Sequence, residues 1–182
     1  MSTISTIATL VVLSTFLAAD SSTPKVVHQQ AFSVMGIEVR TTNVKEASSE
    51  GVIGKQWQKF FQEGVLEKNP NRAGSNLYAV YSNYADGRNG EYSFLIGVRV
   101  PEGSTAPAGL VLRTIPSGSY AVLTSERGPV VKVVVAAWQR VWKMEDEHTL
   151  GGRRAYAADF ELYDQRGIDP QNSQVDLYIG LK

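Results

Sequence analysis

The feature that most constrains the fold is an internal repeat, because the second half of the chain restates the first at a nearly constant offset. The segment FLIGV at 94–98 has a counterpart, LYIGL, at 177–181, which places their glycines 83 residues apart. The strand-like segment EVRT, ending at Thr41, has a counterpart in AVLT, ending at Thr124, again 83 residues later. Such repetition indicates one supersecondary unit used twice, so we expect two paired copies.

Each half also carries one helical pattern. Large apolar residues recur at the three- and four-residue spacing of a helix face, with an offset of 81 residues between the halves. They are Ile53, Trp57, Phe60 and Phe61 in the first half, and Val134, Trp138, Val141 and Trp142 in the second. We predict a first helix from near Ser49 to Gly64. We predict a second that opens with Pro129, although the valines of 130–135 alone would favour a strand.

The remaining segments have the composition and turn boundaries of strands. Their ranges are 26–42, 76–84 and 91–100 in the first half, and 109–125, 153–164 and 174–181 in the second. Each half is therefore strand, helix and hairpin, and PEGSTAPAG separates repeat one, about 26–100, from repeat two, about 109–182. We predict an α+β fold, a tandem β-α-β-β duplication with pseudo-twofold symmetry, antiparallel sheets, one helix per repeat and a central ligand cleft.

Composition excludes several classes of protein. The 18 lysines and arginines balance the 18 aspartates and glutamates, so no positive field favours nucleic acid and no direct nucleic-acid partner is expected. The chain has no cysteine and two histidines, His28 and His148, which we expect to face solvent. This inventory leaves no zinc ribbon, thiol nucleophile or iron–sulfur cluster, so we predict neither a metal site nor a cofactor.

Residues 1–25 form an apolar leader and linker ahead of the domain at 26–182. The apolar run at 7–19 has the length of a signal-peptide core and is short for a bilayer span, and Ala18 and Ala19 suit a cleavage site. No lysine or arginine precedes Lys25, which departs from the signal pattern. Three interpretations stay open: export to the periplasm after cleavage near Ala19, an uncleaved anchor, and an ordinary helix in a cytoplasmic protein. No stable membrane span is expected in the domain itself.

The aligned second strands of the two repeats differ in one telling place, where Ser82 of the first corresponds to Glu161 of the second. Because alternate side chains on a strand share a face, Asp159, Glu161 and Tyr163 point one way. The opposite, more apolar face, which we expect to pack against the helices, carries Tyr156, Ala158, Phe160 and Leu162. Glu161 would then face the groove between the halves.

A carboxylate among aromatic rings favours a cationic partner, because burial alone disfavours the charge and aromatic faces attract cations. We therefore place Glu161 at the centre of a candidate ligand pocket. The aromatic residues expected around it are Trp57, Tyr81, Tyr84, Tyr92, Tyr120, Trp138 and Tyr163. The alternative is an exposed or ion-paired Glu161, with the tryptophans belonging to the core. Asp176 in the last strand is either a second pocket acid or an edge-strand charge, and we favour the latter.

Six segments together resemble the GyrI-like, or bacterial effector-binding, domain family, which occurs alone and fused to the DNA-binding parts of AraC-type and MerR-type multidrug regulators. They cover about 30–182 and read VMGIEVRTTN, IGKQWQKF, YAVYSNYADGRNGEYSFLIGVRV, IPSGSYAVLTS, RAYAADFELYD and VDLYIGLK. The resemblance implies the tandem β-α-β-β fold. It also implies that Glu161, in its F-E-x-Y context, lies at the bottom of the ligand cleft, which is lined by Trp57, Tyr81, Tyr92 and Trp138.

The resemblance further implies a stand-alone module that binds small amphipathic cations such as dyes and drugs. Many relatives carry glutamate in the final strand where this chain has Asp176, so a charge-matching role is not carried over to Asp176. No helix-turn-helix pattern precedes the domain, so DNA binding by this chain is not expected. Two alternatives stay open. One is a hydrolase of strained cyclopropane-type alkylating compounds that uses Glu161 with Tyr163 or Tyr81. The other is a protein-inhibiting partner, since some relatives are linked to DNA gyrase.

Overall fold

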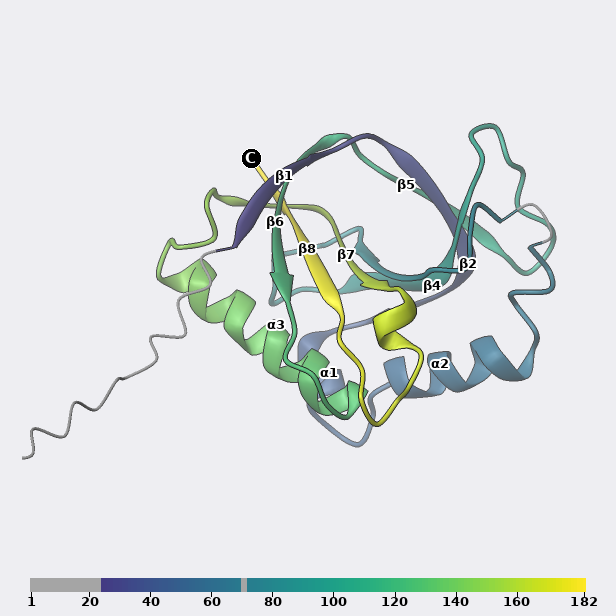
Figure 1. Ribbon diagram of the computed structural model, residues 1–182, viewed down its shortest axis with the longest axis horizontal. Helices are drawn as coiled ribbons and strands as arrows, with labels where there is room; N and C mark the ends of the chain where they lie inside the picture. The colour runs from purple at the N-terminus through teal and green to yellow at the C-terminus, as the bar shows by residue number, and fades with distance from the viewer. Residues whose placement is uncertain (1–23, 70–71) are drawn as a thin grey trace, which may run out of the picture.

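The computed structural model describes residues 24–69 and 72–182, which form an antiparallel sheet with two main helices (Figure 1). The strands are β1 (Lys25–Gln29), β2 (Phe32–Thr41), β3 (Leu77–Ser82), β4 (Tyr92–Val100), β5 (Val111–Ile115), β6 (Gly118–Thr124), β7 (Arg154–Tyr163) and β8 (Asp176–Leu181). The helices are α1 (Asn43–Glu46), α2 (Ile53–Gln62) and α3 (Val130–Asp146), with a short 3-10 helix, η1 (Gln165–Gly167). The predicted α+β class is confirmed.

All eight strands belong to one continuous sheet, in the order β1-β6-β8-β7-β3-β4-β2-β5. Strands β2, β3 and β4 of the first half are neighbours, as are β6, β7 and β8 of the second. The two groups join where β3 pairs with β7, which sets Ala79 opposite Glu161 and Tyr81 opposite Asp159. The prediction of more than one sheet is therefore corrected to one, because this ladder bridges the halves. The tandem duplication and its symmetry stay predictions.

The long strands predicted at 26–42 and 109–125 are each broken into two. β1 pairs with β6, whereas β5 pairs with β2, so the opening strand of each half extends the sheet edge of the other half. Pro116 lies at the second break, where its missing N–H is not needed by a ladder. The exchange of strands interlocks the two halves.

The two predicted helices are confirmed, with shifted ends. α2 begins at Ile53 rather than near Ser49, and Gly64 follows it in the left-handed conformation (φ 59°) that its missing Cβ allows. α3 begins directly after Pro129 and is helical despite its valines. It buries Val133 and Val141, and this tertiary burial outweighs the weak helix propensity of valine.

Both α2 and α3 pack on the same face of the sheet, and this face carries Glu161. Phe60 of α2 and Trp138 of α3 belong to one core cluster with Tyr81 and other strand residues. The prediction that Phe160 faces the helices is wrong, as it is for Ala158 and Leu162. These side chains join a second core cluster, whose buried members are Val34, Tyr78, Val80, Leu95, Ile115, Tyr120, Ala158 and Phe160.

Sheet curvature explains the reversal. The sheet curls so that β1, β2 and β5 arch over the side away from the helices (Figure 1), and Val27, Phe32 and Val111 from these strands pack on the second cluster. The apolar face of β7 is thus covered by the sheet itself. β7 also contains an irregularity between Arg154 and Asp159, which breaks strict alternation.

The glycines of the repeated motif are required by close backbone approach. A Cβ at Gly97 would lie 2.3 Å from the Met35 carbonyl oxygen, and one at Gly180 would lie 2.7 Å from that of Ala158. Both contacts are with neighbouring backbone, which a side chain could not displace. The recurrence of glycine in the segments 94–98 and 177–181 therefore has a steric cause.

Three further expectations concern the surface and the leader. His28 and His148 are exposed, as predicted. Within 24–69 and 72–182, no helix combines the length and apolar content needed to cross a membrane. The apolar run at 7–19, with the expected cleavage near Ala19, lies outside the described residues, so the export prediction stays open.

Candidate functional site

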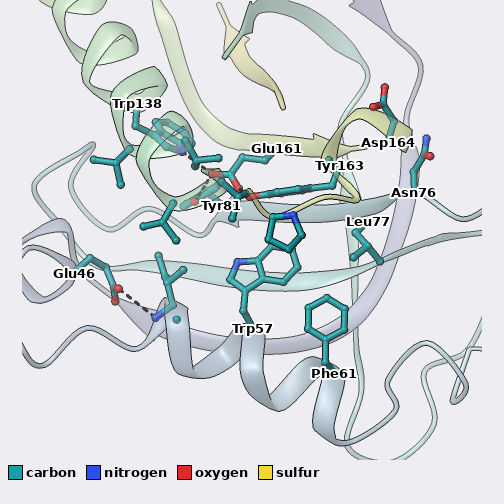
Figure 2. Close-up of a pocket in the computed structure, with 18 of the residues that line it drawn as sticks. Glu46, Trp57, Phe61, Asn76, Leu77, Tyr81, Trp138, Glu161, Tyr163 and Asp164 are labelled. Carbon is teal, nitrogen blue, oxygen red and sulfur yellow. Dashed lines mark hydrogen bonds between the residues drawn. The ribbon is translucent and has the colours of Figure 1, made fainter. Parts of the chain in front are cut away.

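A cavity of about 910 Å³ lies between the helices and the sheet. α2 and α3 form its walls, and strands β3, β4 and β7 contribute its floor (Figure 2). Its volume is in the upper part of the range usual for small-molecule sites. A ligand-sized space thus lies beside Glu161, but on the helix-covered face of the sheet rather than on the opposite face, where the groove was predicted.

Glu161 lies on the floor of this cavity and is 1% exposed. Its Oε1 accepts hydrogen bonds from the Tyr81 hydroxyl at 2.7 Å and from the Trp138 indole N–H at 2.6 Å. Its Oε2 accepts one from the Tyr163 hydroxyl at 2.7 Å. The donors come from β3, α3 and β7, so the carboxylate is held by three separate elements.

Burial raises the pKa of Glu161, although the bonds from Trp138, Tyr81 and Tyr163 act in the opposite direction. Burial and the nearby carboxylate also raise the pKa of Tyr81 and Tyr163, so both phenols stay protonated donors. Among the described residues, no lysine, arginine or histidine forms an ion pair with Glu161. Among these residues, the carboxylate is therefore stabilised by hydrogen bonds from neutral donors and not by an opposite charge.

Asp159, two residues earlier on the same strand face, provides an internal comparison. It is also fully buried, but Arg154 donates to its Oδ2 at 2.7 Å. The Cζ of Arg154 lies 4.3 to 5.6 Å from the ring centroids of Tyr84, Trp138 and Tyr156. One carboxylate of β7 therefore has a guanidinium within an aromatic cage. Glu161, the other, has aromatic neighbours and no such cation among the residues described.

Aromatic rings connect Glu161 to the outside of the protein. The Trp57 ring meets the edge of Tyr163 at 5.0 Å and stacks on Phe61 at 6.0 Å (Figure 2). On the other side, Trp138 contacts Tyr81 at 4.8 Å. Flat, apolar groups can be accommodated between these walls.

The structure brings together all but one of the residues predicted for the site. The predicted residues that line the cavity are Glu161, Trp57, Tyr81, Tyr84, Tyr92, Trp138 and Tyr163. Tyr120 does not line it. Its ring packs in the second core cluster, and its hydroxyl donates to the Pro116 carbonyl at 2.9 Å. Asp176 accepts from Arg166 and Thr124 and does not line the cavity. The edge-strand interpretation is wrong, because β8 lies between β6 and β7 in the sheet.

Three charged residues that line the cavity were not assigned to it from the sequence. Glu46 accepts from the first amide N–H groups of α2, at Val52 and Ile53, and Asp164 pairs with Arg166. Arg154 is the third. Only the position of Glu46, shortly before the α2 pattern, carried a usable signal, since a carboxylate favours a helix N-terminus.

The fold and this cavity define a small-molecule-binding domain, and comparison with known proteins assigns its family. The model of the Cass2 family, described as integron-associated effector binding protein, matches residues 25–181. The chain belongs to this family of effector-binding proteins. The resemblance to GyrI-like effector-binding domains is thereby confirmed.

Individual relatives agree with this assignment. The chain is 30% identical over 153 residues to YobU of Bacillus subtilis (strain 168), a match that covers 81% of this chain and 90% of YobU. It is 34% identical over 163 residues to the transcriptional regulator BrlR of Pseudomonas aeruginosa, covering 85% of this chain and 54% of BrlR, about half that protein's length. A structure of SAV2435 bound to tetraphenylphosphonium shares the fold, with a TM-score of 0.71, 21% identity and coverage of 87% of this chain and 93% of SAV2435.

Proposed function

We propose that this chain binds amphipathic cations, with the positive charge of the ligand next to Glu161 and its apolar groups against the aromatic walls. The observation that carries the proposal is a fully buried carboxylate that has three hydrogen-bond donors and no ion-pair partner among the described residues. A cation in the cavity would supply the missing charge.

The charge distribution along the cavity supports this ligand class. Of the four charged residues lining it, Glu46, Glu161 and Asp164 are acidic. The fourth, Arg154, is already paired with Asp159 and Glu145. At about 4 Å and an effective dielectric constant of about 20, attraction between a ligand cation and Glu161 is about 4 kcal/mol before desolvation. Contacts with the aromatic faces add about 0.5–2 kcal/mol.

The relative SAV2435 binds tetraphenylphosphonium, a lipophilic cation of this class. Its likeness to the present chain is one of fold, so the ligand class rests here on the residues of the cavity itself.

Matched ions of opposite charge test the proposal directly. Tetraphenylphosphonium and tetraphenylborate have nearly the same shape, and their binding can be followed by fluorescence of Trp57 and Trp138. We expect the wild type to prefer the cation by at least tenfold and Glu161→Gln to lose most of that preference. Glu102→Gln, which removes an exposed charge outside the cavity, is the control and should behave as the wild type. Equal affinities of the wild type for both ions would refute the proposal.

Catalysis by the same carboxylate is the second candidate. Burial raises the pKa of Glu161, and the Tyr163 hydroxyl is 2.7 Å from it, so an acid–base pair faces the cavity. A hydrolase that opens cyclopropane-type alkylators would release products of altered mass. Mass spectrometry with wild type and Glu161→Gln distinguishes the two functions, since turnover by wild type alone would support catalysis and intact compounds would contradict it.

A further inference from the structure

The exposed apolar surface of the described residues is concentrated at the mouth of the cavity. Within 24–69 and 72–182, six large hydrophobic side chains are exposed, and four of them line the cavity. These four are Phe61 (60% exposed), Val131 (75%), Val135 (51%) and Ile168 (74%). We call this set the apolar rim. Contiguous exposed apolar surface of this kind is typical of binding sites.

The rim comes from three elements that meet only in the tertiary structure. Phe61 lies at the end of α2, Val131 and Val135 lie on the first turns of α3, and Ile168 follows η1. Each belongs to the same cavity as Glu161. The rim is therefore continuous with the floor rather than a separate patch.

Two valines of α3 are largely exposed to solvent. Val131 and Val135 are one helical turn apart on this strip, where valine buries only part of its apolar area and does not favour the helix. Further along the same helix, Trp138 is buried and donates to Glu161. The strip thus leads from water at the rim to the carboxylate, over about 10 Å along the helix axis.

A parallel path follows α2. Phe61 is exposed and stacks on Trp57, Trp57 meets Tyr163, and Tyr163 donates to Glu161. Figure 2 shows Trp57 and Phe61 projecting from α2 on the side of the cavity opposite Trp138. The two paths form facing apolar walls between the floor and the solvent.

We propose that the preferred ligand is a cation with one extended apolar arm, whose charged group lies at Glu161 while its arm runs between α2 and α3 and covers the apolar rim. This inference rests on the proposed function and narrows its ligand class from compact lipophilic cations to elongated amphiphiles. It also accounts for the exposed valines, which the arm would remove from water.

A series of alkyltrimethylammonium ions tests the arm. Butyl, octyl and dodecyl members are titrated below their micelle concentrations, with phenyltrimethylammonium as the compact cation. In the wild type, affinity should rise about two- to fourfold for each methylene between butyl and octyl, as expected for partial to full burial. Phenyltrimethylammonium reports on the charged floor alone.

The rim variant is the double substitution Val131→Ser with Val135→Ser, and the matched control is Val44→Ser on α1, which is 76% exposed and outside the cavity. Serine and valine have similar helix propensities, so all variants should fold. The rim variant should lose at least tenfold in affinity for the octyl and dodecyl ions and less than twofold for phenyltrimethylammonium. Val44→Ser should keep the wild-type affinity for all of these ions.

The possible outcomes separate the two proposals. If Glu161→Gln leaves phenyltrimethylammonium affinity unchanged, the proposed function fails. If that affinity falls but octyl binds no better than butyl, or the rim variant matches Val44→Ser, only the extended arm is refuted. A wild-type dimer in sedimentation that the rim variant dissociates would assign the rim to a second copy of the chain, and would also overturn the inference.

Discussion

Replacing Glu161 by glutamine should make the protein more stable while weakening cation binding. The glutamine carbonyl can accept from Tyr81 and Trp138 in the position of Oε1, and its amide can donate to the Tyr163 oxygen, which changes the Tyr163 hydroxyl from donor to acceptor in this contact. The substitution therefore removes the charge and leaves the shape.

The magnitude follows from two opposing effects. Burying one ion costs several kcal/mol, whereas each hydrogen bond to a charged group contributes about 1.5–3 kcal/mol and to a neutral one about 1 kcal/mol. Burial raises the pKa of Glu161 despite the three hydrogen bonds, so we take desolvation to be the larger effect. We expect Glu161→Gln to raise the free energy of unfolding at neutral pH by about 1 kcal/mol, or about 2–4 °C in Tm for a domain of this size.

The free energy of unfolding should depend on pH for the same reason. Because the folded-state pKa of Glu161 is raised, folding favours the protonated form of its carboxyl group. The contribution of Glu161 to the free energy of unfolding is therefore most favourable at low pH, and it declines as the pH rises from about 4.5 through the raised pKa. Urea unfolding at several pH values should show variant and wild type converging in acid and diverging toward neutrality. Glu161→Leu, which leaves three donors unpaired, should be less stable than wild type. A less stable Glu161→Gln at neutral pH would refute the reasoning, since the charge would then be net stabilising.

Further predictions test the surroundings of the carboxylate. Cation affinity should fall about tenfold per pH unit below the raised pKa of Glu161, because protons compete with the ligand; calorimetry should find no such slope in Glu161→Gln. Arg154→Met should lower the free energy of unfolding by about 3–5 kcal/mol in urea, since it leaves Asp159 buried without its cation, and adding Asp159→Asn should restore part of the loss. Trp57→Ala should weaken tetraphenylphosphonium binding by about 1–2 kcal/mol in fluorescence titrations, and unchanged affinity would remove Trp57 from the site. Gly97→Ala should lower Tm strongly because its Cβ meets the Met35 backbone; an unchanged Tm would contradict the steric account.

Much of the site could be predicted from the sequence. Helical spacing identified Trp57 and Trp138 as facing residues of two helices, and the replacement of Ser82 by Glu161 in the aligned strands identified the carboxylate. These signals are local, since they depend on periodicity and on comparison of the chain with itself. The valine-rich stretch at 130–135 was recognised as helical for the same reason.

Other features depended on contacts that no local pattern contains. The curl of the sheet decided that Phe160 and Tyr120 face away from the helices, because outer strands rather than helices cover that side. Arg154 was overlooked because its partner Asp159 lies across an irregular stretch of β7 and its aromatic cage comes from three elements.

The sequence by itself determined the helices, the repeated glycines and the acidic residue of the cavity, since each follows from spacing along one segment. Only the tertiary structure decided that Asp159 has a cation and that Glu161 has none among the residues described, although the two occupy the same face of one strand. The physical reason is that the electrostatic environment of a buried carboxylate depends on which distant side chains reach it. That is set by sheet curvature and helix packing rather than by its neighbours in the chain.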